Sequence, residues 1–186
     1  MGARVILQAQ PELQKLGAGF RGVDQVAPLA DPPPAFDFYV RTMSAPAALG
    51  LELDRVPAAV PYLTVDAALC RRWAERVDAE AMNVGLVWAG NPTHIRDRHR
   101  SLPLADLAGL WKIAGVRFVS LQKQLRPEDV AGLLDARPLA NVGVEFESFS
   151  DTAAMITSLD LVICVDTAVA HLAGALGKPV WLLLPA

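Results

Sequence analysis

Two polar segments of this chain carry residue types that bind anions. The first, HIRDRHR at residues 94–100, gathers two histidines and three arginines around one acid. The second opens with Asp166-Thr167, directly after the apolar run DLVICV, and continues as AVAHLAGALG with His171 inside it. Arginine binds phosphate through charge-assisted hydrogen bonds, and a helix N-terminus offers free N–H groups to the same ligand. We therefore expect the two segments to form one pocket for a nucleotide diphosphate.

The residues that open the second segment each have two possible roles. Asp166 or Thr167 could simply cap the following helix through a side-chain oxygen. A carboxylate beside a diphosphate would repel it, so Asp166 fits a cap or a ribose hydroxyl better, whereas Thr167 and the backbone N–H groups fit the phosphates. His171 lies one helical turn beyond Thr167 on the same face, and both a ligand contact and a structural role stay open for it.

The arginine-rich loop follows an apolar strand at residues 83–90, and ligands of open α/β sheets bind beyond the carboxyl ends of the strands. A solvated loop that binds nothing is the alternative. The chain contains neither G-x-x-x-x-G-K-[ST] nor G-x-G-x-x-G, which disfavours ATP-hydrolysing and nicotinamide sites of the familiar kinds. His94 and His99 have no cysteine nearby, so a zinc site is not expected.

Short apolar runs alternate along the chain with helical segments, which predicts an α/β protein with parallel strands and crossover helices. A proline-containing seam and a charged helix separate two regions, so we place a domain boundary near residue 82. The first region, 1–82, is expected to be a partial α/β domain and the second, 83–186, a Rossmann-like domain. Strands are expected at 4–8, 25–29, 36–40, 83–90, 116–122, 143–148, 160–165 and 179–184. Helices are expected at 11–19, 103–114, 126–136, 150–159 with Ser150 or Asp151 as N-cap, and from 168 to Gly177.

The composition is that of a globular protein, with 53% hydrophobic residues and a net charge of -3 over 186 residues. No basic run provides the stripe of positive charge that nucleic-acid binding requires, so that class of partner is excluded. No signal peptide and no apolar stretch of roughly 18 residues is present, so we expect a cytoplasmic protein without a transmembrane segment. Cys70 and Cys164 are expected to be reduced.

Three stretches carry a family resemblance: VGLVWAGNPTHIRDRHRSLPL, VRFVSLQK and DTAVAHLAGALGKPVWLLLP. They resemble the carboxyl-terminal domain of glycosyltransferase family 9, the ADP-heptose:lipopolysaccharide heptosyltransferase type, in the bacterial form fused behind tetratricopeptide repeats. The likeness covers about 83–185, and residues 4–82 look like the later part of the family's amino-terminal domain. It implies a GT-B-like fold, in which two Rossmann-like domains face each other across a cleft and the second binds the nucleotide sugar.

The resemblance also implies binding residues. The D-T-x-x-x-H element, carried here by Asp166, Thr167 and His171, lies near the phosphates and ribose of the donor, although Ala168 replaces the glycine of many members. The basic loop and the end of the next strand would meet the diphosphate, and the segment from 149 would lie near the base. The implied nucleotide-sugar site consists of Asn91, Arg100, Ser101, Gln122, Lys123, Phe149, Ser150, Asp166, Thr167 and His171. Neither a metal nor a cofactor is expected besides the nucleoside diphosphate sugar.

The chain also departs from the family's pattern. The first strand and glycine-rich loop that carry the family's catalytic base have no counterpart, no tetratricopeptide repeats are present, and the sequence stops after LLLP, so we expect a module shortened at both ends. The catalytic residues stay open; Asp37 or Asp54 could serve as base, but no motif supports either. We expect an inverting glycosyltransferase with an unknown glycan or protein acceptor, or alternatively a non-catalytic nucleotide-binding or assembly module. A sugar-nucleotide epimerase is a weaker third possibility. An exposed sheet edge would favour a homo-oligomer in any case.

Overall fold

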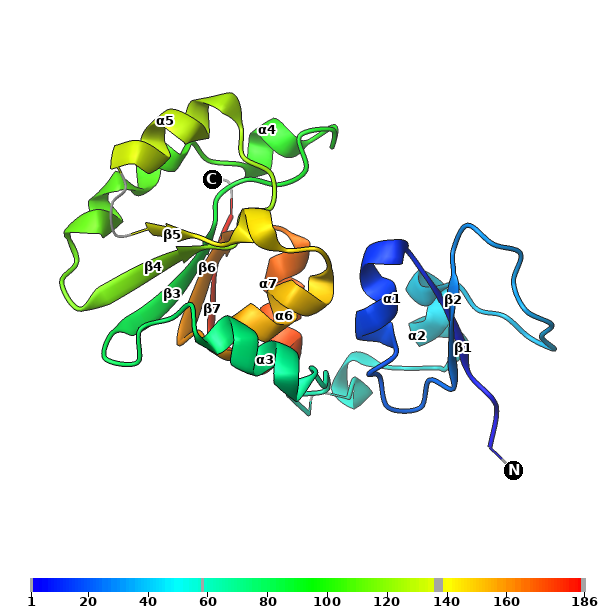
Figure 1. Cartoon of the computed structure of the whole chain (residues 1–186). Helices are drawn as coiled ribbons and strands as arrows, with labels where there is room; N and C mark the ends of the chain where they lie inside the picture. Colours follow the sequence, from blue (N-terminus) through cyan, green and yellow to red (C-terminus); the bar gives the residue numbers. More distant parts are fainter. Residues whose placement is uncertain (1, 58, 136–138, 185–186) are drawn as a thin grey trace.

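The computed structural model describes residues 2–57, 59–135 and 139–184, which form two α/β units joined by a long connection (Figure 1). The larger unit contains a five-stranded, entirely parallel sheet in the order β5-β4-β3-β6-β7. Its strands are β3 (Met82–Val87), β4 (Val116–Ser120), β5 (Leu139–Asn141), β6 (Leu161–Val165) and β7 (Val180–Leu183). Because all five strands are parallel, their carboxyl ends share one edge, where the loops that follow them meet. The expected α/β class with a Rossmann-like parallel sheet is confirmed.

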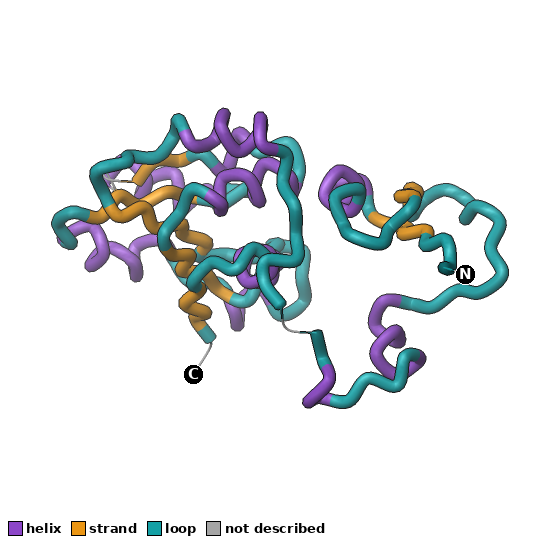
Figure 2. The backbone as a smooth tube through the Cα atoms, turned by 90° about the horizontal axis from the view of Figure 1, so that it is seen from below, coloured by secondary structure: helices purple, strands orange, loops and turns teal. Residues whose placement is uncertain are grey.

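The smaller unit is a single parallel pair with its crossover helix. Its elements are β1 (Ile6–Ala9), α1 (Pro11–Gly17) and β2 (Gln25–Pro28). Residues 29–57 and 59–66 run mostly as loop, as Figure 2 shows, with α2 (Ala45–Ala48) and the 3₁₀-helices η1 (Thr42–Ser44) and η2 (Leu53–Arg55) in between. The strand expected at 36–40 is wrong: this segment pairs with no described strand, and Phe38 and Tyr39 are exposed. Aromatic residues favour a strand only where a neighbouring strand supplies hydrogen bonds and packing.

The larger unit differs from the elements expected from the sequence at three places. Residues Asp97–Arg100 form a short helix inside the segment expected to be a loop. The segment expected as a helix at 103–114 is a 3₁₀-helix, in which Leu104, Leu107 and Leu110, spaced three residues apart, share one face. The strand expected at 143–148 is instead η4, and the fifth strand lies just before it. The helices of the larger unit are α3 (Ala67–Ala74), α4 (Asp97–Arg100), η3 (Leu104–Lys112), α5 (Pro127–Asp135), η4 (Gly143–Glu145), α6 (Phe149–Thr157) and α7 (Ala168–Ala175). None of the helices in the described ranges has the length and apolar character needed to span a bilayer.

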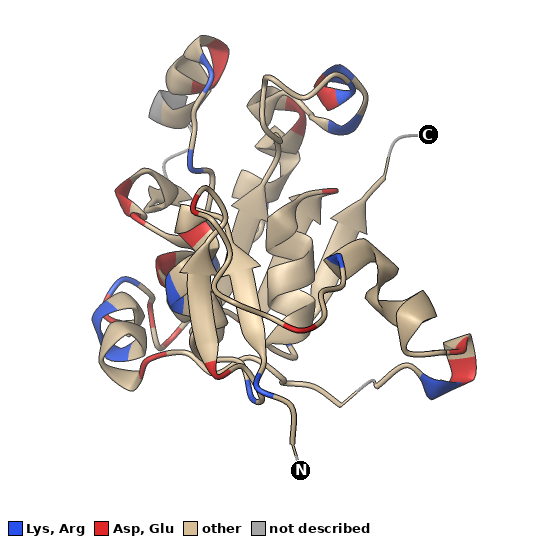
Figure 3. Cartoon of the chain, turned by 90° about the vertical axis from the view of Figure 1, so that its right-hand side faces the viewer, with Lys and Arg blue, Asp and Glu red and all other residues tan. Residues whose placement is uncertain are grey.

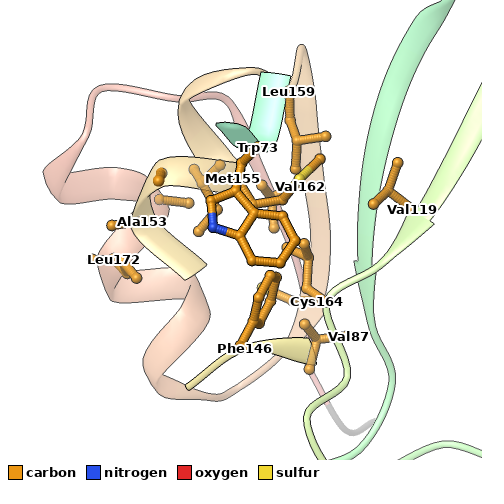
Figure 4. Packing of buried hydrophobic residues seen from close by; sticks show 14 of the residues in the cluster. Trp73, Val87, Val119, Phe146, Ala153, Met155, Leu159, Val162, Cys164 and Leu172 are labelled. Atoms are coloured by element: carbon orange, nitrogen blue, oxygen red, sulfur yellow. The ribbon is translucent and has the colours of Figure 1, made fainter. Parts of the chain in front are cut away.

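Each face of the larger sheet is covered by its own apolar cluster. One face packs on α6 and α7, and here the side chains of Met155 and Val162 lie around Trp73 of α3 (Figure 4). Leu16 of α1 belongs to the same cluster. The opposite face packs on η3 and α5 through Leu86 and Phe118. Helices α1 and α3, which precede the boundary expected near residue 82, therefore contribute to the core of the larger unit through contacts with α6.

Candidate functional site

A pocket of about 480 Å³ opens at the carboxyl edge of the larger sheet. The loops after β3 and β4, the segment between η4 and α6, and the first turn of α7 form its walls, and Glu12 of α1 reaches it from the smaller unit. Its volume lies in the range of roughly 300–1,000 Å³ that small-molecule sites occupy. Six of the ten binding residues expected from the sequence line it: Asn91, Arg100, Gln122, Lys123, Phe149 and Thr167.

Arg100 is held at the pocket by the backbone of both neighbouring loops. It ends the short helix α4, and its Nη1 donates to the carbonyl oxygen of Asp166 at 3.0 Å. The backbone of Gly90 lies against the guanidinium so closely that a Cβ there would stand 2.7 Å from Nη2. The Nε of Arg100 is buried and makes no hydrogen bond with any described residue. Because a guanidinium carries five N–H donors, some of these remain available to a ligand in the pocket.

A buried carboxylate, Asp97, organises the loop behind Arg100. Asp97 is 7% exposed, forms an ion pair with Arg126 and lies 3.8 Å from the Nε of Arg100. It also accepts a hydrogen bond of 2.8 Å from the hydroxyl of Ser101, which in turn accepts one of 3.0 Å from the N–H of Gly90. Ser101 therefore belongs to the loop's internal network and is not a pocket-lining residue. The sequence predicted no role for Asp97 or Arg126, although a single acid among three arginines is a usable signal of an ion-paired carboxylate.

Thr167 occupies the N-cap position of α7 but does not cap it. Its backbone is extended, with φ -142° and ψ 169°, and its side chain makes no capping hydrogen bond. The Oγ1 atom is buried and has no hydrogen-bond partner within the described part of the chain. Ala168 and Val169 of the first turn line the same pocket, and first-turn N–H groups lack acceptors within their own helix. Thr167 therefore does not cap α7, and the N-terminal end of α7 faces the pocket with first-turn N–H groups that have no acceptor within the helix.

Gln122 links the loops that follow β3 and β4. It is 4% exposed, and its amide donates to the carbonyl oxygens of Ala89 at 2.9 Å and Gln124 at 3.1 Å while accepting from the N–H of Ala89 at 3.2 Å. Those bonds commit the amide to the loop backbone, so Gln122 shapes the pocket wall. Lys123, by contrast, is exposed, lines the pocket and forms no ion pair with a described residue.

The N-terminal end of α6 differs from that of α7 because the carboxylate of Asp151, in the first turn of α6, lies there. Ser148 is the N-cap, in place of the expected Ser150 or Asp151, and Asp151 accepts from the Ser148 N–H at 2.9 Å and hydroxyl at 3.0 Å. The indole Nε1 of Trp73 donates to the other oxygen of Asp151 at 3.2 Å. Burial alone would raise the pKa of Asp151, but hydrogen bonds from Trp73, Ser148 and Glu147 hold it below the ordinary value of 3.8. An anionic ligand is therefore favoured at α7 over α6.

The remaining expected residues lie outside the pocket lining. Ser150 lines a smaller groove with Lys15 and Thr64, and His171 is exposed on α7. Asp166 contributes its carbonyl oxygen to Arg100, while its residue surface is exposed. Asp37 and Asp54 are exposed and do not line the pocket.

Two acids for which the sequence predicted no role, Glu12 and Glu147, line the pocket. No local pattern could have identified Glu12, because its position depends on α1 packing against α6. Lysine and arginine positions are dispersed among acidic ones on helices and loops in Figure 3, so positive charge at the pocket comes from single residues. No three histidine, cysteine or acidic residues within the described ranges are arranged to hold a metal ion.

The chain was compared with curated proteins, solved structures and protein-family models. No curated protein matches the chain. One solved structure, described as ADP-heptose lps heptosyltransferase II of E. coli, is similar with a TM-score of 0.49 and 16% identity, over 70% of this chain and 42% of that chain. The chain therefore spans less than half the length of that relative. Residues 133–183 match the family model of glycosyltransferase family 9 (heptosyltransferase), which confirms the family resemblance for the segment from the end of α5 to β7.

Proposed function

We propose that this chain binds a nucleoside diphosphate sugar in the pocket at the carboxyl edge of its larger sheet and acts in glycosyl transfer. The observation that carries the proposal is the meeting of Arg100 with the uncapped tip of α7, joined by the bond from Arg100 to the carbonyl of Asp166. Guanidinium donors, a free hydroxyl on Thr167 and first-turn N–H groups converge there, and such a set suits two linked phosphates.

The orientation of the donor follows from the two helix tips. The diphosphate belongs at α7, because Asp151 already satisfies the tip of α6 with negative charge. The nucleoside then extends toward Phe149 and Ser148, where an aromatic ring and polar groups line the pocket. Lys123, on the loop after β4, adds a second cation beside the phosphates.

The chemistry that these residues support is the departure of a nucleoside diphosphate. The acceptor oxygen would attack the anomeric carbon, the bond from that carbon to the diphosphate would break, and the electron pair would leave with the diphosphate. Arg100, Lys123 and the N–H groups of α7 would stabilise the developing negative charge. A carboxylate must take the proton of the acceptor hydroxyl, and Glu12, which the smaller unit places in the pocket, is our candidate.

A binding module without transfer is the second candidate function. This function is favoured because, among the described residues, the smaller unit contributes a single residue, Glu12, to the pocket lining. Such a module would bind nucleoside diphosphates and leave the sugar bond intact.

Two measurements on the same protein separate these functions. Calorimetric titration with ADP, GDP and UDP should show saturable binding of at least one of them. Incubation of the matching nucleotide sugars, with release of nucleoside diphosphate as the readout, should show turnover that Glu12→Gln lowers about 100-fold without changing nucleoside diphosphate affinity. Binding without turnover would support the binding module, and absence of binding by all three nucleotides would overturn both functions.

A further inference from the structure

Helix α3 and Arg76, two residues beyond its end, contact the segment 145–151 at three points, and this segment forms one wall of the pocket. The indole N–H of Trp73 donates to Asp151 at 3.2 Å, and the ring of Trp73 stands edge-on to Phe146, with centroids 4.9 Å apart and an interplanar angle of 77° (Figure 4). Arg76, just beyond the helix, forms an ion pair with Glu145. Trp73 does not line the pocket; it is 1% exposed and touches the back of the wall.

Asp151 connects the indole to the surface that a ligand would meet. One carboxylate oxygen accepts from Trp73, and the other accepts from the N–H and the hydroxyl of Ser148, which lines the pocket. The carboxylate is thus fixed from both sides, and its position fixes the turn that presents Ser148 and Phe149. Removal of the indole N–H leaves one buried oxygen short of a donor, so the carboxylate and the turn attached to it are free to shift.

We propose that Trp73 and Arg76 are positioning residues for the nucleoside end of the pocket. They set the affinity for the nucleoside through the wall at 145–151 while leaving the diphosphate seat at Arg100 and Thr167 unaffected. This inference depends on the proposed function, because it assumes that a nucleotide occupies the pocket. It goes beyond that function by assigning nucleotide recognition in part to side chains that no ligand touches.

The test compares two probes: the nucleoside diphosphate that binds the unmodified protein most tightly among ADP, GDP and UDP, and inorganic pyrophosphate. In Trp73→Phe the ring remains and the donor is lost, so we expect the dissociation constant for the nucleoside diphosphate to rise about tenfold. The constant for pyrophosphate should stay within about twofold, because pyrophosphate does not reach the altered wall.

Trp88→Phe is the matched control. Trp88 is 0% exposed, lies in the cluster on the opposite face of the sheet, and its Nε1 has no hydrogen-bond partner among the described residues, so this variant loses the same atoms without losing a bond. Its nucleotide affinity should not change. Arg76→Gln provides a second variant that alters only an exposed ion pair and so preserves the fold, with an expected two- to fivefold weakening for the nucleoside diphosphate alone.

Three results would overturn the inference while leaving the proposed function intact. The first is an unchanged nucleotide affinity in both Trp73→Phe and Arg76→Gln. The second is an equal loss of nucleotide affinity in Trp73→Phe and Trp88→Phe. The third is that Trp73→Phe lowers the affinities for pyrophosphate and for the nucleotide by the same factor. If Trp73→Phe fails to fold, as judged by circular dichroism, Arg76→Gln decides alone. Absence of nucleotide binding by the unmodified protein would overturn the proposed function and this inference together.

Discussion

Replacement of Thr167 by valine should move stability and ligand affinity in opposite directions. The hydroxyl of Thr167 is buried, makes no capping bond and has no hydrogen-bond partner within the described residues. A buried hydroxyl without a partner costs about 1–3 kcal/mol, and valine replaces it with a methyl group of similar size. The extended backbone at this position also suits a β-branched residue. Thr167→Val should therefore raise the free energy of unfolding by about 1 kcal/mol and the melting temperature by about 2–4 °C.

The same change should weaken nucleotide binding. A hydrogen bond from this hydroxyl to a charged phosphate oxygen would contribute about 1.5–3 kcal/mol. At about 1.4 kcal/mol for each factor of ten, its loss corresponds to a roughly 10- to 150-fold rise in the dissociation constant for a nucleoside diphosphate. Calorimetric titration and thermal unfolding of the same preparation measure both quantities.

Thr157→Val is the matched control. The Thr157 hydroxyl donates to the carbonyl oxygen of Ala154 at 2.7 Å, and Thr157 does not line the pocket. This variant should lose about 1 kcal/mol of stability and keep its nucleotide affinity. If Thr167→Val destabilises the protein as Thr157→Val does and binds nucleotide with unchanged affinity, the Thr167 hydroxyl has a structural role and does not bind the ligand.

Two further predictions concern the loop and the thiols. Gly90→Ala places a methyl group 2.7 Å from the Arg100 Nη2 and must displace the guanidinium. We therefore expect nucleotide affinity to fall about tenfold with little change in melting temperature. An unchanged affinity would show that Arg100 does not contact the ligand. Burial, helped by the negative charge of Asp166, raises the pKa of the Cys164 thiol to about 11, whereas Cys70 is only partly buried. A raised pKa keeps the Cys164 thiol protonated at pH 8, so the native protein should show one reactive thiol per chain and the denatured protein two reactive thiols. Two reactive thiols in the native protein would show that Cys164 is accessible and would contradict this prediction.

Local sequence signals were sufficient to predict the elements around Thr167, where we place the phosphates. The apolar run of β6, the polar pair after it and the small residues of α7 predicted a strand, a turn and a helix, and the structure has them at Leu161–Val165 and Ala168–Ala175. The meeting of Arg100 and Thr167 also followed from local reasoning, because parallel strands place their carboxyl ends at one edge.

Local signals failed where distant contacts decide. At 143–148 the sequence alternates as a strand would, but a Cβ at Gly143 would stand 2.5 Å from the backbone of Leu121 and Gln122, and the chain turns there as η4. The segment 36–40 is also rich in aromatic residues, yet no described strand pairs with it. Trp73 supports the pocket wall through its hydrogen bond to Asp151, a residue 78 positions away in the sequence. No periodicity in the sequence could indicate such a contact.

A structure of the protein bound to the nucleoside diphosphate with the highest affinity would show where the phosphates and the nucleoside lie. We predict phosphate oxygens within hydrogen-bonding distance of the Thr167 hydroxyl and the Arg100 guanidinium, with the nucleoside lying toward Phe149. A nucleotide bound away from the carboxyl edge of the larger sheet, or bound there with its phosphates at Ser148 and its base at α7, would contradict this prediction.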